Sequence, residues 1–246
     1  MGKVIVVTSG KGGTGKTSLT GGVASCLAAL GHRTLCIDMD IGLRNLDLSL
    51  GMSDRALMDF TDVLAGRCPL ERAAVCHPVI HNLYLLTAPL TVPPSGFSQR
   101  ALLAMLHHAR EMYEYIVVDC PAGLGSGFHL AVCGADRAVV VSTNDSSALR
   151  DAQRTVMELY RYMNTIHLVM NRIQPKLMRR LRTTIDDAMD AAGLPLLGVV
   201  PEDSQVMLAA NVNQPLVLYA RKGAVHAYLN IAKRLMGERV PLMKIH

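Results

Sequence analysis

The segment Gly10–Thr17 constrains this chain more than any other part of its sequence. It reads Gly-Lys-Gly-Gly-Thr-Gly-Lys-Thr and fits the phosphate-loop pattern G-x-x-x-x-G-K-[ST]. A β-rich run at 3–9 precedes it and a helical stretch at 18–30 follows it, which is the context that the pattern requires. Glycines let backbone N–H groups turn inward around a phosphate, and a helix N-terminus presents its positive dipole end to the same anion. The segment therefore predicts a phosphate site in a strand–loop–helix unit.

Acidic residues that follow two other apolar runs fit the same site. Asp119 ends the run at 115–119, which has the layout of a Walker B strand. Asp38 and Asp40 follow the run at 33–37, and side chains two residues apart on a strand point the same way. Because ligands bind at the carboxyl ends of parallel strands, we expect these acids to serve metal or water chemistry.

Roles within the site follow from the chemistry of phosphates. Lys16 is placed to reach the β- and γ-phosphates, and the Thr17 hydroxyl to ligate Mg²⁺. Gly123, four residues after Asp119, offers its N–H group to a γ-phosphate.

Short apolar runs alternate with amphipathic stretches along the whole chain of 246 residues. The runs are continuously apolar, which is typical of strands buried on both faces. We expect strands at 3–9, 33–37, 83–87, 115–119, 137–143, 166–171 and 196–201, and helices at 18–30, 98–113, 146–163, 176–192 and 224–236. This alternation predicts a parallel sheet covered by helices. The turn-rich stretch 89–98 is expected to be a loop and not a domain boundary, so we expect a single domain over 1–246.

The charge balance and the cysteine positions limit the kinds of partner and site that this chain can have. The chain has 25 Lys and Arg against 20 Asp and Glu, and the stretch 161–182 is basic with no acid. Such a stretch is either a solvated helix face or a surface for an anionic partner such as DNA or a lipid headgroup. The six cysteines show no CxxC or zinc-ligand spacing, so we expect reduced thiols. No apolar run approaches the roughly 18 residues of a membrane-spanning helix.

A second lysine early in the loop, Lys11, makes the motif resemble the deviant Walker A of the MinD/ParA family of P-loop ATPases. The stretch 38–48 (Asp-Met-Asp-Ile-Gly-Leu-Arg-Asn-Leu-Asp-Leu) is similar to switch I of the MinD branch, and 119–123 (Asp-Cys-Pro-Ala-Gly) is similar to its switch II. The stretches 149–154, 170–172 and 198–203 match further parts of the family in order. The resemblance therefore covers essentially the whole chain, and Lys11 and the Gly-Leu-Arg-Asn stretch are its most specific parts.

The resemblance implies a single-domain α/β P-loop NTPase that hydrolyses ATP with Mg²⁺ and forms an ATP-dependent sandwich homodimer. It implies that Lys11 reaches the phosphates of the other subunit, that Asp40 positions the attacking water and that Asn171 reads the adenine edge. Catalysis is assigned to Lys11, Lys16 and Asp40, and Mg²⁺ binding to Thr17, Asp38 and Asp119, with both carboxylates acting through waters. The nucleotide site comprises Gly10, Lys11, Gly12, Gly13, Thr14, Gly15, Lys16, Thr17, Ser18, Gly123, Asn171, Arg172, Pro201, Glu202 and Asp203.

In the cell, the resemblance implies a spatial regulator of septum placement with MinC- or MinE-like partners. It implies a cytoplasmic protein that can lie peripherally on the inner face of the plasma membrane. MinD chains end in an amphipathic membrane-targeting helix, whereas five residues follow Pro241 here, too few for such a helix. We therefore expect membrane binding to be weak or absent in this chain.

Departures from the family pattern keep other functions open. Gly125 stands where an acid is expected after switch II, and Asn-Asp-Ser at 144–146 replaces the usual Asn-Pro-Glu. A ParA-like partitioning module would bind DNA through the basic stretch 161–182. A flagellar-number regulator has a similar sequence, although the pair Arg44–Asn45 in switch I disfavours it. An iron–sulfur relative of nitrogenase iron protein is disfavoured by the cysteine positions.

Overall fold

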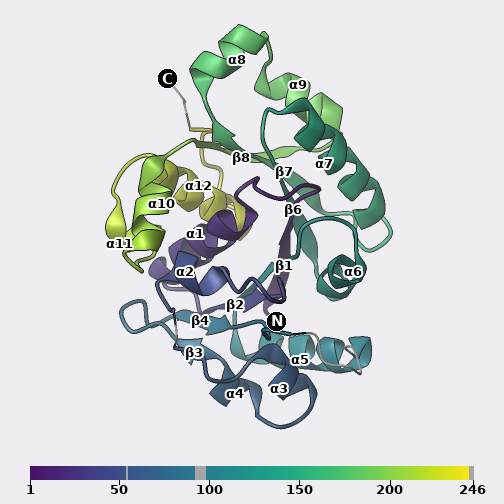
Figure 1. Cartoon of the computed structure of the whole chain (residues 1–246), viewed down its shortest axis with the longest axis vertical. Coiled ribbons are helices and arrows are strands. Elements are labelled where there is room, and N and C mark those ends of the chain that lie inside the picture. The colour runs from purple at the N-terminus through teal and green to yellow at the C-terminus, as the bar shows by residue number, and fades with distance from the viewer. Residues whose placement is uncertain (54, 92–97, 244–246) are drawn as a thin grey trace.

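One eight-stranded sheet forms the centre of the protein in a computed structural model, which describes residues 1–53, 55–91 and 98–243. The strand order is β3-β4-β2-β5-β1-β6-β7-β8, and every pair is parallel except the antiparallel pair of β3 and β4 (Figure 1). The strands are β1 (Lys3–Thr8), β2 (Thr34–Asp38), β3 (Val75–Cys76), β4 (Leu83–Leu86), β5 (Tyr115–Asp119), β6 (Arg137–Ser142), β7 (Ile166–Ile173) and β8 (Leu196–Pro201).

Helices cover both faces of this sheet and make two separate cores. One core contains side chains from α1, α2, α11 and α12, including Leu19 and Tyr228, and the other contains side chains from α3, α5, α6 and α7, including Phe128 and Val156. The helices are α1 (Lys16–Ala29), α2 (Leu46–Leu50), α3 (Phe60–Leu64), α4 (Leu70–Ala73), α5 (Gln99–Met112), α6 (Ser126–Val132), α7 (Ser146–Leu159), α8 (Pro175–Leu181), α9 (Ile185–Ala192), α10 (Ser204–Asn211), α11 (Leu216–Tyr219) and α12 (Ala224–Met236). The expected single-domain α/β fold, with a mostly parallel sheet between two helical layers, is confirmed.

All seven expected strands are present, but the single helix expected at 176–192 is wrong. The chain forms α8 and α9 there, because Arg182 takes a left-handed conformation with φ 54° and ends α8. Thr184 then starts α9 with a capping box, in which its side chain accepts from Asp187 N while the Asp187 side chain accepts from Thr184 N. The two-residue strand β3 and the short helices α2, α3, α4, α6, α10 and α11 were not expected.

Two sequence expectations fall partly outside the described residues. Residues 92–97 of the expected loop 89–98 lie outside them, as do residues 244–246 of the tail considered for membrane binding. Leu242 and Met243 do lie within them, beside an apolar cavity of about 570 Å³ that Met178 and Met189 also line. Within the described ranges, none of the helices has the length and apolar character needed to cross a bilayer.

Candidate nucleotide-binding site

The residues predicted to bind the phosphates and the metal meet at the carboxyl ends of β1, β2 and β5. The loop Gly10–Gly15 leaves the end of β1 and enters α1 at Lys16. Asp38 and Asp119 end the neighbouring strands β2 and β5 and are register partners. Parallel strands thus bring three segments that are far apart in sequence to one edge of the sheet, as ligand binding at a parallel sheet requires.

Asp119 is the centre of a buried polar cluster beneath the loop. Its Oδ1 lies 2.8 Å from Lys16 Nζ and accepts from Thr20 Oγ1 at 2.9 Å, while its Oδ2 accepts from Thr17 Oγ1 at 2.7 Å. These contacts compensate for taking the carboxylate out of water. They also hold the predicted phosphate lysine, the predicted metal hydroxyl and a predicted metal carboxylate in one cluster.

Asp38 organises the segment that follows β2. Its Oδ1 accepts from Asp40 N at 2.8 Å, and its Oδ2 accepts from Leu46 N at 3.3 Å, so one carboxylate holds both ends of the turn 39–45. Burial, and next the neighbouring Asp119, raise the pKa of Asp38 to about 7. Burial also raises the pKa of the half-buried Asp40, and the Lys16 ammonium opposes that shift. The site therefore holds three carboxyl groups whose charge one lysine does not fully balance, which suits a divalent cation.

The loop offers unpaired donors to an anion. Among the described residues, the N–H groups of Gly12, Gly13, Thr14, Gly15 and Lys16 donate to no protein acceptor. The buried Thr14 Oγ1 has no partner there either. A Cβ built on Gly12 or Gly13 would meet nothing within 4 Å, so the space beside these two Cα atoms is open. Backbone donors, a lysine, and hydroxyl and carboxylate oxygens are the groups that a nucleoside triphosphate and Mg²⁺ require, and the residues fit both.

The residues predicted for the base site lie beside the loop. Asn171 is buried, and its Nδ2 donates to Thr14 O at 2.8 Å and more weakly to Gly15 O at 3.4 Å. Arg172 bonds Gly13 O and pairs with Glu202, and these two residues line a cavity of about 250 Å³ together with Lys11, Thr14 and Gln174. Asp203 caps α10 by accepting from Gln205 N. Adenine recognition by this group stays a prediction.

Three predicted residues have other contacts in this structure. Lys11 Nζ is bound within its own chain, at 3.0 Å from Asp145 Oδ2 and 2.7 Å from Ser147 Oγ. The N–H group of Gly123 donates to Ser9 O at 3.3 Å. Ser18 lines a small cavity against Ser49 and Val206. Their predicted roles toward phosphates remain untested.

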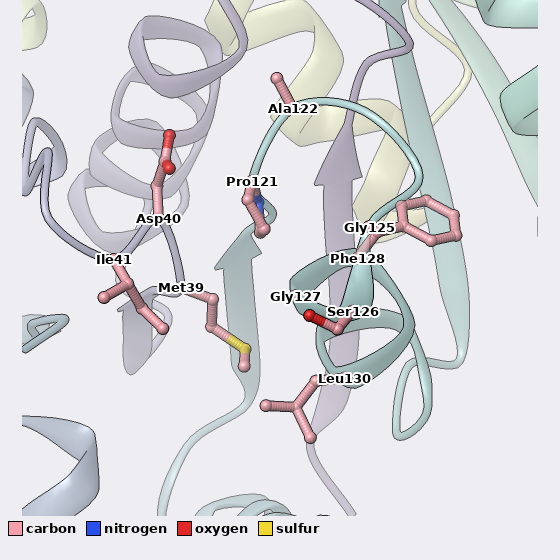
Figure 2. Close-up of a pocket in the computed structure, with 10 residues that line it drawn as sticks. All are labelled: Met39, Asp40, Ile41, Pro121, Ala122, Gly125, Ser126, Gly127, Phe128 and Leu130. Atoms are coloured by element: carbon pink, nitrogen blue, oxygen red, sulfur yellow. The ribbon is translucent and has the colours of Figure 1, made fainter. Parts of the chain in front are cut away.

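An apolar pocket of about 470 Å³ lies beside Asp40. Figure 2 shows Met39, Asp40 and Ile41, which follow β2, opposite Pro121 and the start of α6 at Ser126. Gly125, the position where an acid was expected, lines this pocket and presents no side chain to it.

The strand β7 divides the basic stretch 161–182. Arg161 precedes β7, in the turn after α7, and Arg172 lies near the other end of the strand. Arg161 pairs with Glu158 at 3.0 Å, and Arg172 pairs with Glu202 at 2.8 Å. The comparisons with relatives give DNA binding no support.

The model of the CobQ/CobB/MinD/ParA nucleotide binding domain matches residues 5–216. This chain belongs to that family. Similar proteins include members of its MinD branch: the septum site-determining protein MinD of Bacillus subtilis is 39% identical, over 98% of this chain and 92% of the MinD chain. The MinD chain in a MinC:MinD cell division protein complex from Aquifex aeolicus is 36% identical over 98% of both chains, with a TM-score of 0.91. MinD from Pyrococcus horikoshii OT3, solved with Mg-ADP, is 30% identical over 96% of both chains, with a TM-score of 0.84.

Some site residues were missed in the sequence. Thr20 was one, although its position four residues after Lys16 places both on one face of α1. Asp145 and Ser147, which bind Lys11, were others; Asp145 belongs to the unusual stretch 144–146, but nothing in that stretch pointed to Lys11. No local pattern links Lys11 to residues more than 130 positions away.

Proposed function

We propose that this chain is a Mg²⁺-dependent ATPase that switches between a monomer and an ATP-bridged dimer, and that this switch regulates where the division septum is placed. The observation that carries the proposal is the cluster of Lys16, Thr17 and Asp119 beneath five N–H groups at 12–16 that have no acceptor in the described part of the chain. The division role is supported by MinD relatives of nearly the same length.

The chain's own residues divide the chemistry between binding and water activation. The loop N–H groups and Lys16 hold the phosphates, and bound Mg²⁺ would neutralise part of their charge. Thr17, Asp38 and Asp119 would supply the oxygens that hold the cation, directly or through waters. Asp40 is fixed by the bond from its N–H to Asp38, and its carboxylate orients the water that attacks the γ-phosphorus.

The partners of the relatives extend the proposal. One solved relative is a MinC:MinD complex, and we propose that a MinC-like protein binds this chain as well. A MinE-like partner, a cytoplasmic location and weak peripheral contact with the inner face of the plasma membrane belong to the same proposal.

The test is ATP hydrolysis and oligomeric state measured on the same protein. Purified chain should bind MgATP, hydrolyse it slowly and elute as a dimer only with ATP when hydrolysis is blocked. Protein that binds no nucleotide would refute the ATPase proposal. Protein that hydrolyses ATP but captures no MinC-like partner would refute the division role alone.

A further inference from the structure

The strand β7 is irregular where it passes the phosphate loop. Its pairing with β8 shifts register between Met170 and Ile173, and Arg172 there has a left-handed backbone with φ 57°. In a regular strand, successive side chains point to opposite faces of the sheet. Here the side chains of Asn171 and Arg172, although adjacent in sequence, reach the same loop.

These two side chains bind three consecutive carbonyl groups of the loop. Arg172 Nη1 donates to Gly13 O at 3.0 Å, and Asn171 Nδ2 donates to Thr14 O at 2.8 Å and to Gly15 O at 3.4 Å. The contact is close, since a Cβ on Gly15 would lie 2.3 Å from Asn171 Nδ2. The irregular end of β7 thus sets the direction of the Gly13 and Thr14 carbonyls, whereas Gly15 O also accepts from Leu19 N at 3.0 Å within α1.

The direction of a carbonyl sets that of the next N–H group. In a planar trans peptide, the C=O and the following N–H point in opposite directions. The carbonyls of Gly13 and Thr14 point toward β7, so the N–H groups of Thr14 and Gly15 point away from it. These are two of the five N–H groups at 12–16 without a protein acceptor among the described residues.

Glu202 holds the guanidinium group of Arg172 in place. Its Oε2 accepts from Arg172 Nε at 2.8 Å, and its Oε1 lies 3.5 Å from Nη2. This two-point contact occupies one edge of the guanidinium and leaves Nη1 directed at Gly13 O. A lysine could not make both contacts, because its ammonium group is a point charge and not a planar fork.

We propose that Asn171, Arg172 and Glu202 are positioning residues that brace the phosphate loop in its anion-binding shape before nucleotide arrives. The proposal rests on the proposed binding of ATP at this loop and adds a role for these three residues. They would strengthen the binding of any polyphosphate chain, whatever base it carries. A base-reading role for the same residues makes the opposite prediction, because it would change the preference for adenine and leave phosphate binding unaltered.

Calorimetric titration with three probes separates these roles. We would titrate wild type, Arg172→Ala and Glu202→Gln with MgATP, MgGTP and magnesium tripolyphosphate. Arg179→Ala serves as the matched control, since Arg179 is an exposed arginine on the neighbouring helix α8. Bracing predicts that Arg172→Ala weakens all three ligands by a similar factor of about ten, the effect of losing a charged hydrogen bond. Glu202→Gln should weaken them by less, and the double variant should bind no more weakly than Arg172→Ala.

Turnover and folding complete the test. At saturating ATP, kcat of Arg172→Ala should stay within about twofold of wild type while KM rises, because bracing acts on loop shape and not on the attacking water. A thermal melt of each variant shows whether it is folded. If Arg172→Ala does not fold, Glu202→Gln, which keeps the side-chain volume, provides the test instead. Wild-type affinity for tripolyphosphate in folded variants, or a loss confined to ATP, would overturn the proposal. Failure of wild type itself to bind MgATP would instead refute the proposed function.

Discussion

Lys16 and Asp119 form an ion pair that is almost completely removed from solvent. Lys16 Nζ lies 2.8 Å from Asp119 Oδ1, and the two side chains are 6% and 1% exposed. The pair joins the first residue of α1 to the last residue of β5, elements that meet only in the folded chain. The same lysine therefore supports the fold and supplies the charge for the phosphates, and these two roles can be separated by mutation.

Lys16→Ala should abolish nucleotide binding and also destabilise the protein. The binding loss follows from removing the lysine charge beneath the loop, and the destabilisation, about 3 kcal/mol, from leaving Asp119 buried and unpaired. Adding Asp119→Asn should restore much of the stability but none of the binding. Chemical denaturation and calorimetry measure the two effects. Nucleotide binding by Lys16→Ala within a few-fold of wild type would contradict the phosphate-loop assignment.

Asp40→Ala should keep ATP binding and lose turnover. Asp40 bonds Asp38 through its backbone N–H, so truncating the side chain leaves that contact and the turn intact. Loss of a group that positions water should lower kcat by a factor on the order of 100. Single-turnover hydrolysis measures this, with ATP affinity as the control. If hydrolysis is undiminished, water activation belongs to another group, and Asp38→Asn would be the next variant to measure.

Seven strands were predictable because burial on both faces leaves a continuous apolar run in each. The strand β3 has only two residues, too few to give such a pattern. The end of α8 at Arg182 depends on a left-handed backbone conformation that a non-glycine residue rarely takes. The capping residues Thr184 and Asp187 did signal the start of α9, but the basic residues before them fit one long helix equally well.

The site was predictable as a set of residues but not as a set of contacts. Motif spacing brought Lys16, Thr17 and Asp119 together correctly. It could not show that Thr20 bonds Asp119, because the phosphate-loop pattern ends at Thr17 and assigns no role to Thr20. It also could not show that Asn171 and Arg172 turn toward one loop, because the register shift that turns them depends on the pairing of β7 with β8.

Stability should fall as the pH is lowered, and His77 should account for part of the fall. His77 is buried, its Nδ1 accepts from Val79 N at 3.0 Å and Ile80 N at 2.9 Å, and burial lowers its pKa. The unfolded chain, where the pKa is about 6.5, therefore takes the proton first. The contribution of neutral His77 is complete above pH 6.5 and is lost as the pH falls through the lower pKa of the folded protein.

The variant His77→Asn tests this directly. Its amide oxygen can accept the same bonds without titrating, so its melting temperature should fall less between pH 8 and pH 5 than that of wild type. His226→Asn, an exposed change on α12, is the control and should follow wild type. An equal fall in His77→Asn and wild type would assign the acid sensitivity to other groups.

Lys11 should exchange one partner for another when the dimer forms. In this structure its ammonium binds Asp145 and Ser147 at the start of α7, and the Ser147 hydroxyl together with Lys11 lowers the pKa of Asp145 to about 2. Both members of this ion pair are about half exposed, so the contact is easily given up. If Lys11 bonds phosphates held by a second subunit, ATP stabilises the dimer more than ADP does. Light scattering after size exclusion should then show a dimer for Asp40→Ala with MgATP and a monomer with MgADP.

Two further substitutions in the Asp40→Ala background show which partner Lys11 binds in the dimer. Adding Lys11→Ala should return the sample to monomer while ATP remains bound. Adding Asp145→Ala should instead strengthen dimerisation a few-fold, because it frees Lys11 from a competing contact without touching the loop. Dimers that form with unchanged affinity in the Lys11 variant would show that this lysine contributes only local positive charge. Weaker dimers in the Asp145 variant would show that Asp145 supports the dimer and does not compete with it.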